Sequence, residues 1–255
     1  MNTKRFLILL LTITLLFGFA CSAAKEETEA YGTAQVIIPE RTVSETESVS
    51  TPVPTVPLKT PAPDMLPEMA EYYAQNNDVV GKLTIEDTVI DYLVMYSGDD
   101  YYINHNFYKN YQRSGCLYID KYCTVDPRDT NLLIHGHNMK SGIMFGALDK
   151  YLDEDYYKDH KYITYTTLYE VETYEVFAVF VSQVFKKTDT VFKYYNFHNA
   201  ETELEYNKFV NNCRALSVFD TGVIPEFGDQ LLTLSTCDYS KEDGRMVVVA
   251  RKISE

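Results

Sequence analysis

The feature that most constrains the fold of this chain is a series of short, strand-like apolar runs separated by turn signals. Eight such runs occur, and each is too short or too regularly alternating to be a typical helix: KLTI, VIDYLVM, GCLYID, NLLIHGH, KYITYTT, TYEVFAVFVSQVF, QLLTLSTC and MVVVARKI. Turn signals such as SGDD, DPRDT and EFGD lie between them. Many short strands with little helix predict a mainly β fold, a mixed or antiparallel barrel rather than alternating βαβ units.

Two helices are predicted around these strands. The first follows Pro67 in LPEMAEYYAQNNDVVGKL and places Met69, Tyr72, Tyr73 and Asn76 on one face. The second interrupts the later strands at 200–216, where four apolar residues recur at near-helical spacing: Leu204, Phe209, Val210 and Cys213.

The N-terminal quarter of the chain differs in composition from the rest. Residues 1–24 combine a basic start with an apolar run and are predicted to be an export segment, which is excluded from the fold. GFAC, ending at Cys21, resembles a lipoprotein cleavage box, so lipidated Cys21, an uncleaved membrane anchor and free secretion are the three alternatives. Residues 25–63, rich in Thr, Ser, Glu and Pro, are predicted to be a disordered tether, and 64–255 a single folded domain.

Charge and cysteine usage exclude several classes of function. The net charge of −14 argues against a nucleic-acid-binding protein and against adsorption to an anionic membrane surface. The five cysteines form no CxxC pair, and their odd number on an exported chain does not indicate a disulfide framework. A free thiol is therefore expected outside the cytoplasm.

The segment TLSTCDYSKEDGRMVVVARKI places a thiol and a guanidinium close together. Cys237 ends one predicted strand, and Arg245 opens the next after a short polar turn. A thiol that attacks a carbonyl beside a cation that stabilises the resulting oxyanion is one interpretation. A buried structural cysteine beside a surface arginine is the other.

A nucleophilic thiol needs a partner that accepts its proton, and two of the five histidines stand out. His135 and His137 end the apolar strand NLLIHGH, and strand alternation places both on one face. His105, His160 and His198 lie in polar segments typical of solvated surface residues. The pair at 135 and 137 fits a Cys–His catalytic pair, a metal site or two structural histidines, although no HExxH or second ligand cluster supports a metal.

Taken together, these motifs resemble the sortases, the cysteine transpeptidases of Gram-positive surfaces. The TLSTC box, the strand-opening Arg and the GH strand carry the resemblance. GHNMKSGIMFGAL, NNDVVGKLTIEDTVIDYLVM, YYINHNFYKNYQRSGCLYID and the helix at 200–216 resemble class B in particular. The similarity covers about residues 64–255. It implies an eight-stranded β-barrel with N-terminal helices and an extra helix before the final strands.

The resemblance also implies roles for individual residues. His137, Cys237 and Arg245 match the catalytic residues of the family. Ser235 and Asn104 match positions that contact the substrate peptide. His135 stands where a Tyr usually precedes the GH and is a third candidate substrate contact. No metal and no cofactor are implied.

The implied reaction is cleavage of a sorting pentapeptide of secreted proteins after Thr, through a thioester, and transfer to a cell-wall peptide amine or peptidoglycan precursor. The expected location is the extracytoplasmic face of the membrane, held there through the N-terminal segment. The alternatives are an extracytoplasmic cysteine peptidase, a pilin-polymerising sortase and a ligand-binding surface lipoprotein.

Overall fold

The computed structural model describes residues 59–60, 62 and 64–253, and these form a closed barrel with helices outside it. The strands are β1 Val79–Thr84, β2 Asp91–Met95, β3 Leu117–Ile119, β4 Asn131–His135, β5 Tyr162–Thr167, β6 Val171–Gln183, β7 Leu231–Asp238 and β8 Gly244–Lys252. The α-helices are α1 Pro67–Gln75, α2 Glu154–Asp159 and α3 Glu203–Leu216, and the 3₁₀ segments are η1 Tyr101–Ile103, η2 Phe145–Leu152 and η3 Tyr194–Asn196. Each of the eight predicted strands is present.

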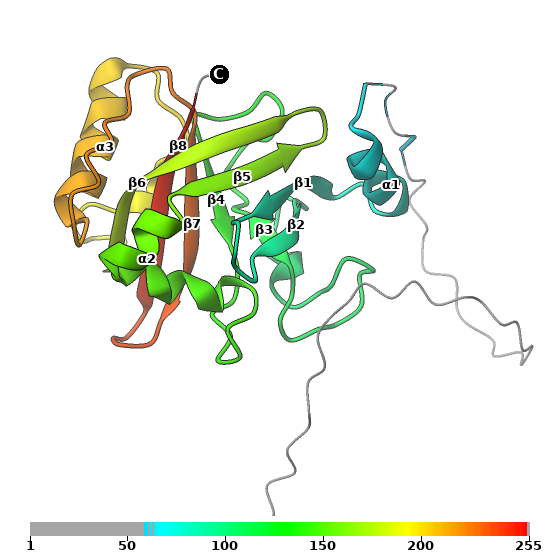
Figure 1. Ribbon diagram of the computed structural model, residues 1–255, viewed down its shortest axis with the longest axis horizontal. Coiled ribbons are helices and arrows are strands. Elements are labelled where there is room, and N and C mark those ends of the chain that lie inside the picture. Colours follow the sequence, from blue (N-terminus) through cyan, green and yellow to red (C-terminus); the bar gives the residue numbers. More distant parts are fainter. Residues whose placement is uncertain (1–58, 61, 63, 254–255) are drawn as a thin grey trace, which may run out of the picture. The chain divides into compact units, whose positions relative to one another are not determined.

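The order of strands around the barrel explains how distant segments meet. The order is β1-β2-β3-β4-β7-β8-β6-β5, closed by pairing of β5 with β1. Two neighbouring pairs, β2 with β3 and β4 with β7, are parallel, and the other pairs are antiparallel. The predicted mixed β-barrel is therefore confirmed. The strands β4, β7 and β8 lie side by side (Figure 1).

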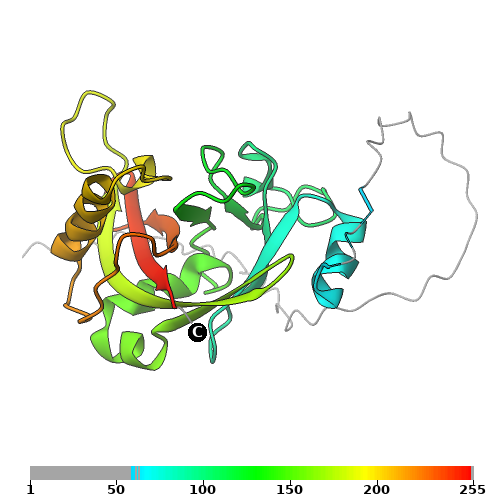
Figure 2. The ribbon, with the colours of Figure 1, turned by 90° about the horizontal axis from the view of Figure 1, so that it is seen from above.

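The helices lie on different sides of the barrel. In Figure 2, α3 lies on the outer side of β6, whereas α1 lies at the far end of the molecule beside β1. α3 is capped by Thr202, whose hydroxyl accepts from the Glu205 N–H while the Glu205 carboxylate accepts from the Thr202 N–H. This reciprocal capping box satisfies two backbone donors that the first helical turn leaves unpaired.

Two helical expectations need correction. The first helix ends at Gln75, because the alternating run that follows pairs as β1. Leu204 is 79% exposed. It lies five positions before Phe209, and at 3.6 residues per turn this spacing points it away from the buried face of α3. Tyr206 belongs to that face instead, with Phe209, Val210 and Cys213.

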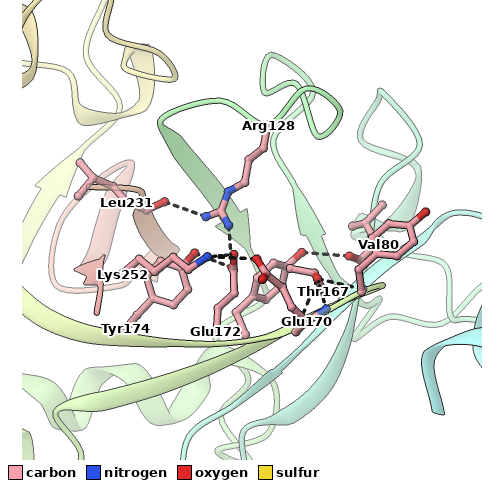
Figure 3. A network of polar contacts seen from close by, with 10 residues as sticks. Val80, Arg128, Thr167, Glu170, Glu172, Tyr174, Leu231 and Lys252 are labelled. Carbon is pink, nitrogen blue, oxygen red and sulfur yellow. Dashed lines mark hydrogen bonds and ion pairs between the residues drawn. The ribbon is translucent and has the colours of Figure 1, made fainter. Parts of the chain in front are cut away.

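A buried polar network closes the barrel end where β7 begins and β8 ends (Figure 3). The carboxylate of Glu172, 3% exposed, lies 2.7 Å from Arg128 Nη1 and 2.6 Å from Lys252 Nζ, and accepts the Tyr174 hydroxyl at 2.7 Å. Arg128 Nη2 also donates to the carbonyl of Leu231. Burial alone would raise the pKa of Glu172, but these cations and the Tyr174 hydroxyl hold it below its ordinary value.

No helix in the described ranges is both long and apolar enough to cross a bilayer. The predicted export segment at 1–24, including Cys21, lies outside the described residues, as does nearly all of the predicted tether at 25–63. The predicted domain boundaries therefore remain predictions.

Candidate active site

Cys237 and Arg245 lie on adjacent strands at the end of the barrel opposite the Glu172 network, and His137 follows the end of the next strand, β4. Cys237 on β7 pairs directly with Arg245 on β8. On its other side, β7 pairs in parallel with β4 up to His135 and Ser235. His137 lies two residues beyond this last pair, in the segment that leaves β4, and Cys237 lies two residues beyond it on β7. The register thus sets Cys237 beside Arg245, and the chain that leaves β4 carries His137 past the same end of β7.

Two glycines allow the backbone to take this course. A Cβ on Gly136 would lie 2.4 Å from Leu117 Cδ2 and 2.8 Å from Phe145 Cδ2, so only glycine fits before His137. A Cβ on Gly244 would lie 2.4 Å from the carbonyl oxygen of Asp238. The turn that separates Cys237 from Arg245 can close this tightly because residue 244 has no side chain.

The imidazole of His137 is held by the backbone of a distant segment. Its Nε2 lies 2.7 Å from the carbonyl oxygen of Ile103, at the end of η1. A carbonyl oxygen only accepts hydrogen bonds, so Nε2 carries the proton in the neutral ring. Nδ1 is then the nitrogen available to accept a proton. A base oriented by a third group is the arrangement that nucleophilic catalysis uses.

The guanidinium of Arg245 is half-buried and bonded to neutral oxygens. Its Nη1 donates to the carbonyl of Gly244 at 2.8 Å and more weakly to that of Asp243 at 3.4 Å. It forms no ion pair with any carboxylate among the described residues. Because carbonyl oxygens are weaker partners than carboxylates, the cation keeps the capacity to bind a new anionic oxygen.

A cavity of about 900 Å³ begins at Arg245 and extends under the segment that joins β6 to β7. Tyr194, Tyr195 and His198 of that segment line it, and His135 lines the wall formed by β4. The Tyr194 hydroxyl shares a 2.7 Å hydrogen bond with Ser235 Oγ, and burial raises the pKa of Tyr194, so the hydroxyl keeps its proton. The cavity is large enough for several residues of an extended peptide.

The structure places the three predicted substrate contacts at different distances from this cavity. His135 lies in its wall, and Ser235 is buried behind Tyr194. Asn104 directly follows Ile103, whose carbonyl holds His137, so it lies on the His137 side of the site. The roles of these three residues in contacting a peptide remain predictions.

The sequence did not reveal that Asp120 and His198 belong to this site. Asp120 Oδ2 accepts from His135 Nε2 at 2.8 Å, and His198 Nε2 lies 3.7 Å from Oδ1. Although burial opposes it, these histidines and the Tyr122 N–H hold the pKa of Asp120 below its ordinary range. Asp120 directly follows β3, and the register of β3 with β4 had to be known before its partner could be found.

The prediction of a solvated surface position is wrong for His198, which has a side chain 17% exposed and lines the cavity. His105 and His160 are half-buried. His105 stacks on Tyr101 at 3.9 Å between ring centroids, and His160 stacks on Tyr156 at 4.0 Å. In both stacked pairs the rings are four residues apart, and each histidine also bonds the carbonyl of its tyrosine.

The remaining described cysteines are unsuited to nucleophilic chemistry. Burial raises the pKa of Cys116 and of Cys123 to about 12, and raises the pKa of the fully buried Cys213 well above its ordinary value. Their thiols stay protonated at neutral pH, and a protonated thiol is a poor nucleophile. All four described cysteines, Cys237 included, are free. No group of three or more His, Cys, Asp or Glu side chains in the described ranges is arranged to hold a metal.

Comparison with known proteins agrees with this geometry. The sortase domain family matches residues 83–253. Sortase B of Listeria monocytogenes is 38% identical over 194 residues, which cover 74% of this chain and 75% of that protein. The Staphylococcus aureus sortase B–substrate complex superposes with a TM-score of 0.67 at 26% identity, covering 75% of this chain and 87% of that one. A sortase B complexed with triglycine gives a TM-score of 0.66 at 27% identity, with 74% and 86% covered.

The chain therefore belongs to the sortase family, and its relatives place it in class B. It is a sortase-type transpeptidase whose closed eight-stranded barrel carries an additional helix before the last two strands. The TLSTC box, the strand-opening Arg and the GH strand had predicted the family, and the histidine loop, the N-terminal segments and the helix at 200–216 had predicted the class.

Proposed function

We propose that this protein joins secreted proteins to a cell-surface amine, with Cys237 as nucleophile, His137 as acid and base, and Arg245 as oxyanion ligand. The observation that carries the proposal is the direct pairing of Cys237 with Arg245, with His137 two residues beyond the His135–Ser235 pair that joins β4 to β7. The cavity that starts at Arg245 provides room for the peptide beside these residues.

The first half-reaction cleaves the donor peptide. The Cys237 thiolate attacks the carbonyl carbon of the Thr in the sorting motif, and the electron pair of the C=O bond moves to oxygen. Arg245 stabilises this oxyanion, because its guanidinium is always charged and offers several N–H donors. The C–N bond then breaks, and the departing amine takes a proton from the imidazolium of His137, leaving a thioester.

The second half-reaction uses an amine. The acceptor amine attacks the thioester carbon, gives its proton to His137, and the C–S bond breaks to regenerate the thiolate. Because Ile103 holds Nε2, Nδ1 of His137 transfers the proton in both steps. A relative whose structure is described as complexed with triglycine supports a peptide amine as acceptor. A cell-wall cross-bridge peptide is the acceptor that we propose here.

A peptide assay with and without an added amine tests this function. A fluorogenic sorting pentapeptide incubated with triglycine should yield the triglycine adduct, and Cys237→Ala should form neither adduct nor cleaved peptide. Loss of a nucleophile that acts in concert with its base costs on the order of 10⁶-fold. Cleavage without any amine adduct would instead assign the chain to the cysteine peptidases. Activity retained in Cys237→Ala would remove the thiol from the mechanism.

Thiol labelling separates an enzyme from a surface lipoprotein that only binds a ligand. A methanethiosulfonate reagent at neutral pH should modify Cys237 before the other cysteines of the domain. Cys116 and Cys123 have pKa values of about 12 and should react slowly until the protein unfolds. Peptide mapping after a short pulse identifies the labelled residue. Equal labelling of Cys116 and Cys237 would count against an activated thiol.

The proposed location is the extracytoplasmic face of the membrane. The support is the apolar run with Cys21 in the N-terminal segment of the sequence. Metabolic labelling with a fatty acid should mark the wild-type chain and not Cys21→Ser if Cys21 is lipidated. An unlabelled chain that still sediments with membranes would indicate an uncleaved anchor.

A further inference from the structure

Beyond the last residue of β4, side chains continue the hydrogen-bond ladder that joins β4 to β7. The last backbone contact of this ladder is Gly136 N–H to the Ser235 carbonyl, at 3.3 Å. The next acceptor along β4, the Gly136 carbonyl, receives the hydroxyl of Thr236 at 2.7 Å. The next acceptor along β7, the Cys237 carbonyl, receives the side-chain amide of Asn138 at 2.9 Å. His137 lies between these two side-chain contacts.

Asn138 is fixed on several sides. It is 8% exposed, and its Nδ2 also donates to Asp149 Oδ2 at 2.9 Å, so both amide protons have acceptors. A carboxylate and a carbonyl oxygen both only accept, which fixes the NH₂ group toward them. The backbone carbonyl of Asn138 accepts the Tyr239 hydroxyl at 3.1 Å. The residue after His137 is therefore bonded to Cys237 itself and to the turn that follows it.

We propose that Asn138, oriented by Asp149, is a positioning residue that sets His137 against Cys237. The inference rests on the proposed function of that pair. Asn138 reaches no reacting atom, but it joins the backbone of the nucleophile to the residue next to the base. A displacement of the order of 1 Å between reacting groups costs about 10²-fold in rate. Two strands that diverge at the end of a backbone ladder would be free to separate by that amount.

The same strand pair supplies a matched control. Asn131, at the other end of β4, is also buried and also bonded to β7, because its Oδ1 accepts from Thr233 Oγ1 at 2.8 Å. Its Nδ2 donates to the carbonyl of Phe197 at 2.9 Å. Asn131→Ala removes a comparable buried amide between the same two strands, six residues before His137.

The first experiment compares the two alanine variants in the peptide-and-triglycine assay, at a temperature where circular dichroism shows both folded. Asn138→Ala should lower kcat about 10- to 100-fold with little change in KM. Asn131→Ala should lower the melting temperature to a similar extent and leave kcat within about twofold of wild type. Equal kcat values for Asn138→Ala and Asn131→Ala would overturn the proposal.

A double variant separates a role of Asn138 in positioning His137 from a role in stability alone, through its contact with Asp149. It also provides a test if Asn138→Ala does not fold. In Asn138→Asp with Asp149→Asn, the new amide at 149 can donate to the new carboxylate at 138, so the contact between the two residues is restored. The carboxylate at 138 has no proton for the Cys237 carbonyl. We expect the melting temperature to recover only in part, because the carboxylate at 138 and the Cys237 carbonyl both only accept hydrogen bonds, while kcat stays low. Recovery of kcat together with the melting temperature would show that the contact between residues 138 and 149 is sufficient, and would overturn the role of the bond to Cys237.

These outcomes are distinguishable from failure of the proposed function. If wild type forms no triglycine adduct, the transfer reaction itself is wrong, and the rate of Cys237 alkylation against pH becomes the readout. An imidazole held beside the thiol imposes its own pH dependence on alkylation, which Asn138→Ala should alter and Asn131→Ala should not. An unchanged alkylation profile in Asn138→Ala would overturn the positioning role by this second route.

Discussion

The strands β7 and β8 have two ends that handle charge in opposite ways. At the Leu231 end, the buried carboxylate of Glu172 is bonded to Arg128, Lys252 and Tyr174. At the Cys237 end, Arg245 donates only to backbone carbonyls of its own turn. The first end has its charges neutralised within the protein, whereas the second presents a half-buried cation to a cavity.

The difference shows where the fold is stabilised and where it is available for chemistry. A buried ion that loses its partner is costly, so the groups around Glu172 depend on one another. A cation bonded to neutral oxygens can exchange them for an oxyanion at little cost to the fold. One arginine at each end therefore offers a direct experimental contrast.

Arg128→Ala should give the largest effect, a loss of about 3–5 kcal/mol in the free energy of unfolding, because Glu172 stays buried without its main cation. Urea unfolding followed by circular dichroism measures it. The folded fraction should keep wild-type kcat, because the network lies at the other end of β7 from Cys237. A stable Arg128→Ala protein with low kcat would break the division between the two ends.

Arg245→Ala should show the converse behaviour. Loss of an oxyanion ligand lowers kcat by about 10²–10³-fold. The free energy of unfolding should change by no more than about 0.5 kcal/mol, because the side chain forms no ion pair within the described residues. The peptide-and-amine assay and urea unfolding on one preparation give both values. Destabilisation comparable to that of Arg128→Ala would show that Arg245 is a structural cation.

Tyr174→Phe should have an intermediate effect on stability. It removes one donor from the buried Glu172 carboxylate, and hydrogen bonds to charged groups contribute about 1.5–3 kcal/mol. Tyr151→Phe is the matched control, because Tyr151 is equally buried but donates to the neutral carbonyl of His160. Its loss should cost about 0.5–1.5 kcal/mol. Equal losses of stability for the two variants would indicate that the charge of Glu172 does not strengthen its hydrogen bond with Tyr174.

Acidification of the wild-type protein should give the smallest effect, measured as the change in the free energy of unfolding per pH unit. The folded pKa of Glu172 is lowered, so its stabilising contribution is complete above the ordinary Glu value of about 4.3 and is lost as the pH falls below it. One carboxylate contributes at most about 1.4 kcal/mol per pH unit. Glu172→Gln should flatten the dependence of the unfolding free energy on pH below that value. The pH dependence that remains in this variant should come in part from Asp120, whose pKa is also lowered. An unchanged slope would exclude Glu172 from acid unfolding.

The sequence predicted the barrel because strands are encoded by local patterns, and the same patterns mark the three candidate catalytic residues, whose roles remain predictions. Alternation defined the strands, and Cys237, Arg245 and His137 lie at strand ends that the pattern marks. The register between β4 and β7, which joins Asn138 to Cys237, involves residues about a hundred positions apart and has no local signal. The same holds for Arg128 with Glu172 and for Asp120 with His135. Leu204 was misplaced because its spacing of five positions from Phe209 does not fit the helical repeat of the buried face.

The equal register of β4 and β7 makes the chemistry of this protein separable from its specificity. The ladder sets His135 level with Ser235, and the Asn138 side chain then bonds the Cys237 carbonyl, whatever the length of the chain between the two strands. The segment 184–230, which connects β6 to β7, supplies much of the cavity wall but none of that ladder. Exchange of this segment between relatives is therefore a route to new peptide preferences on an unchanged catalytic frame, for evolution and for protein engineers alike.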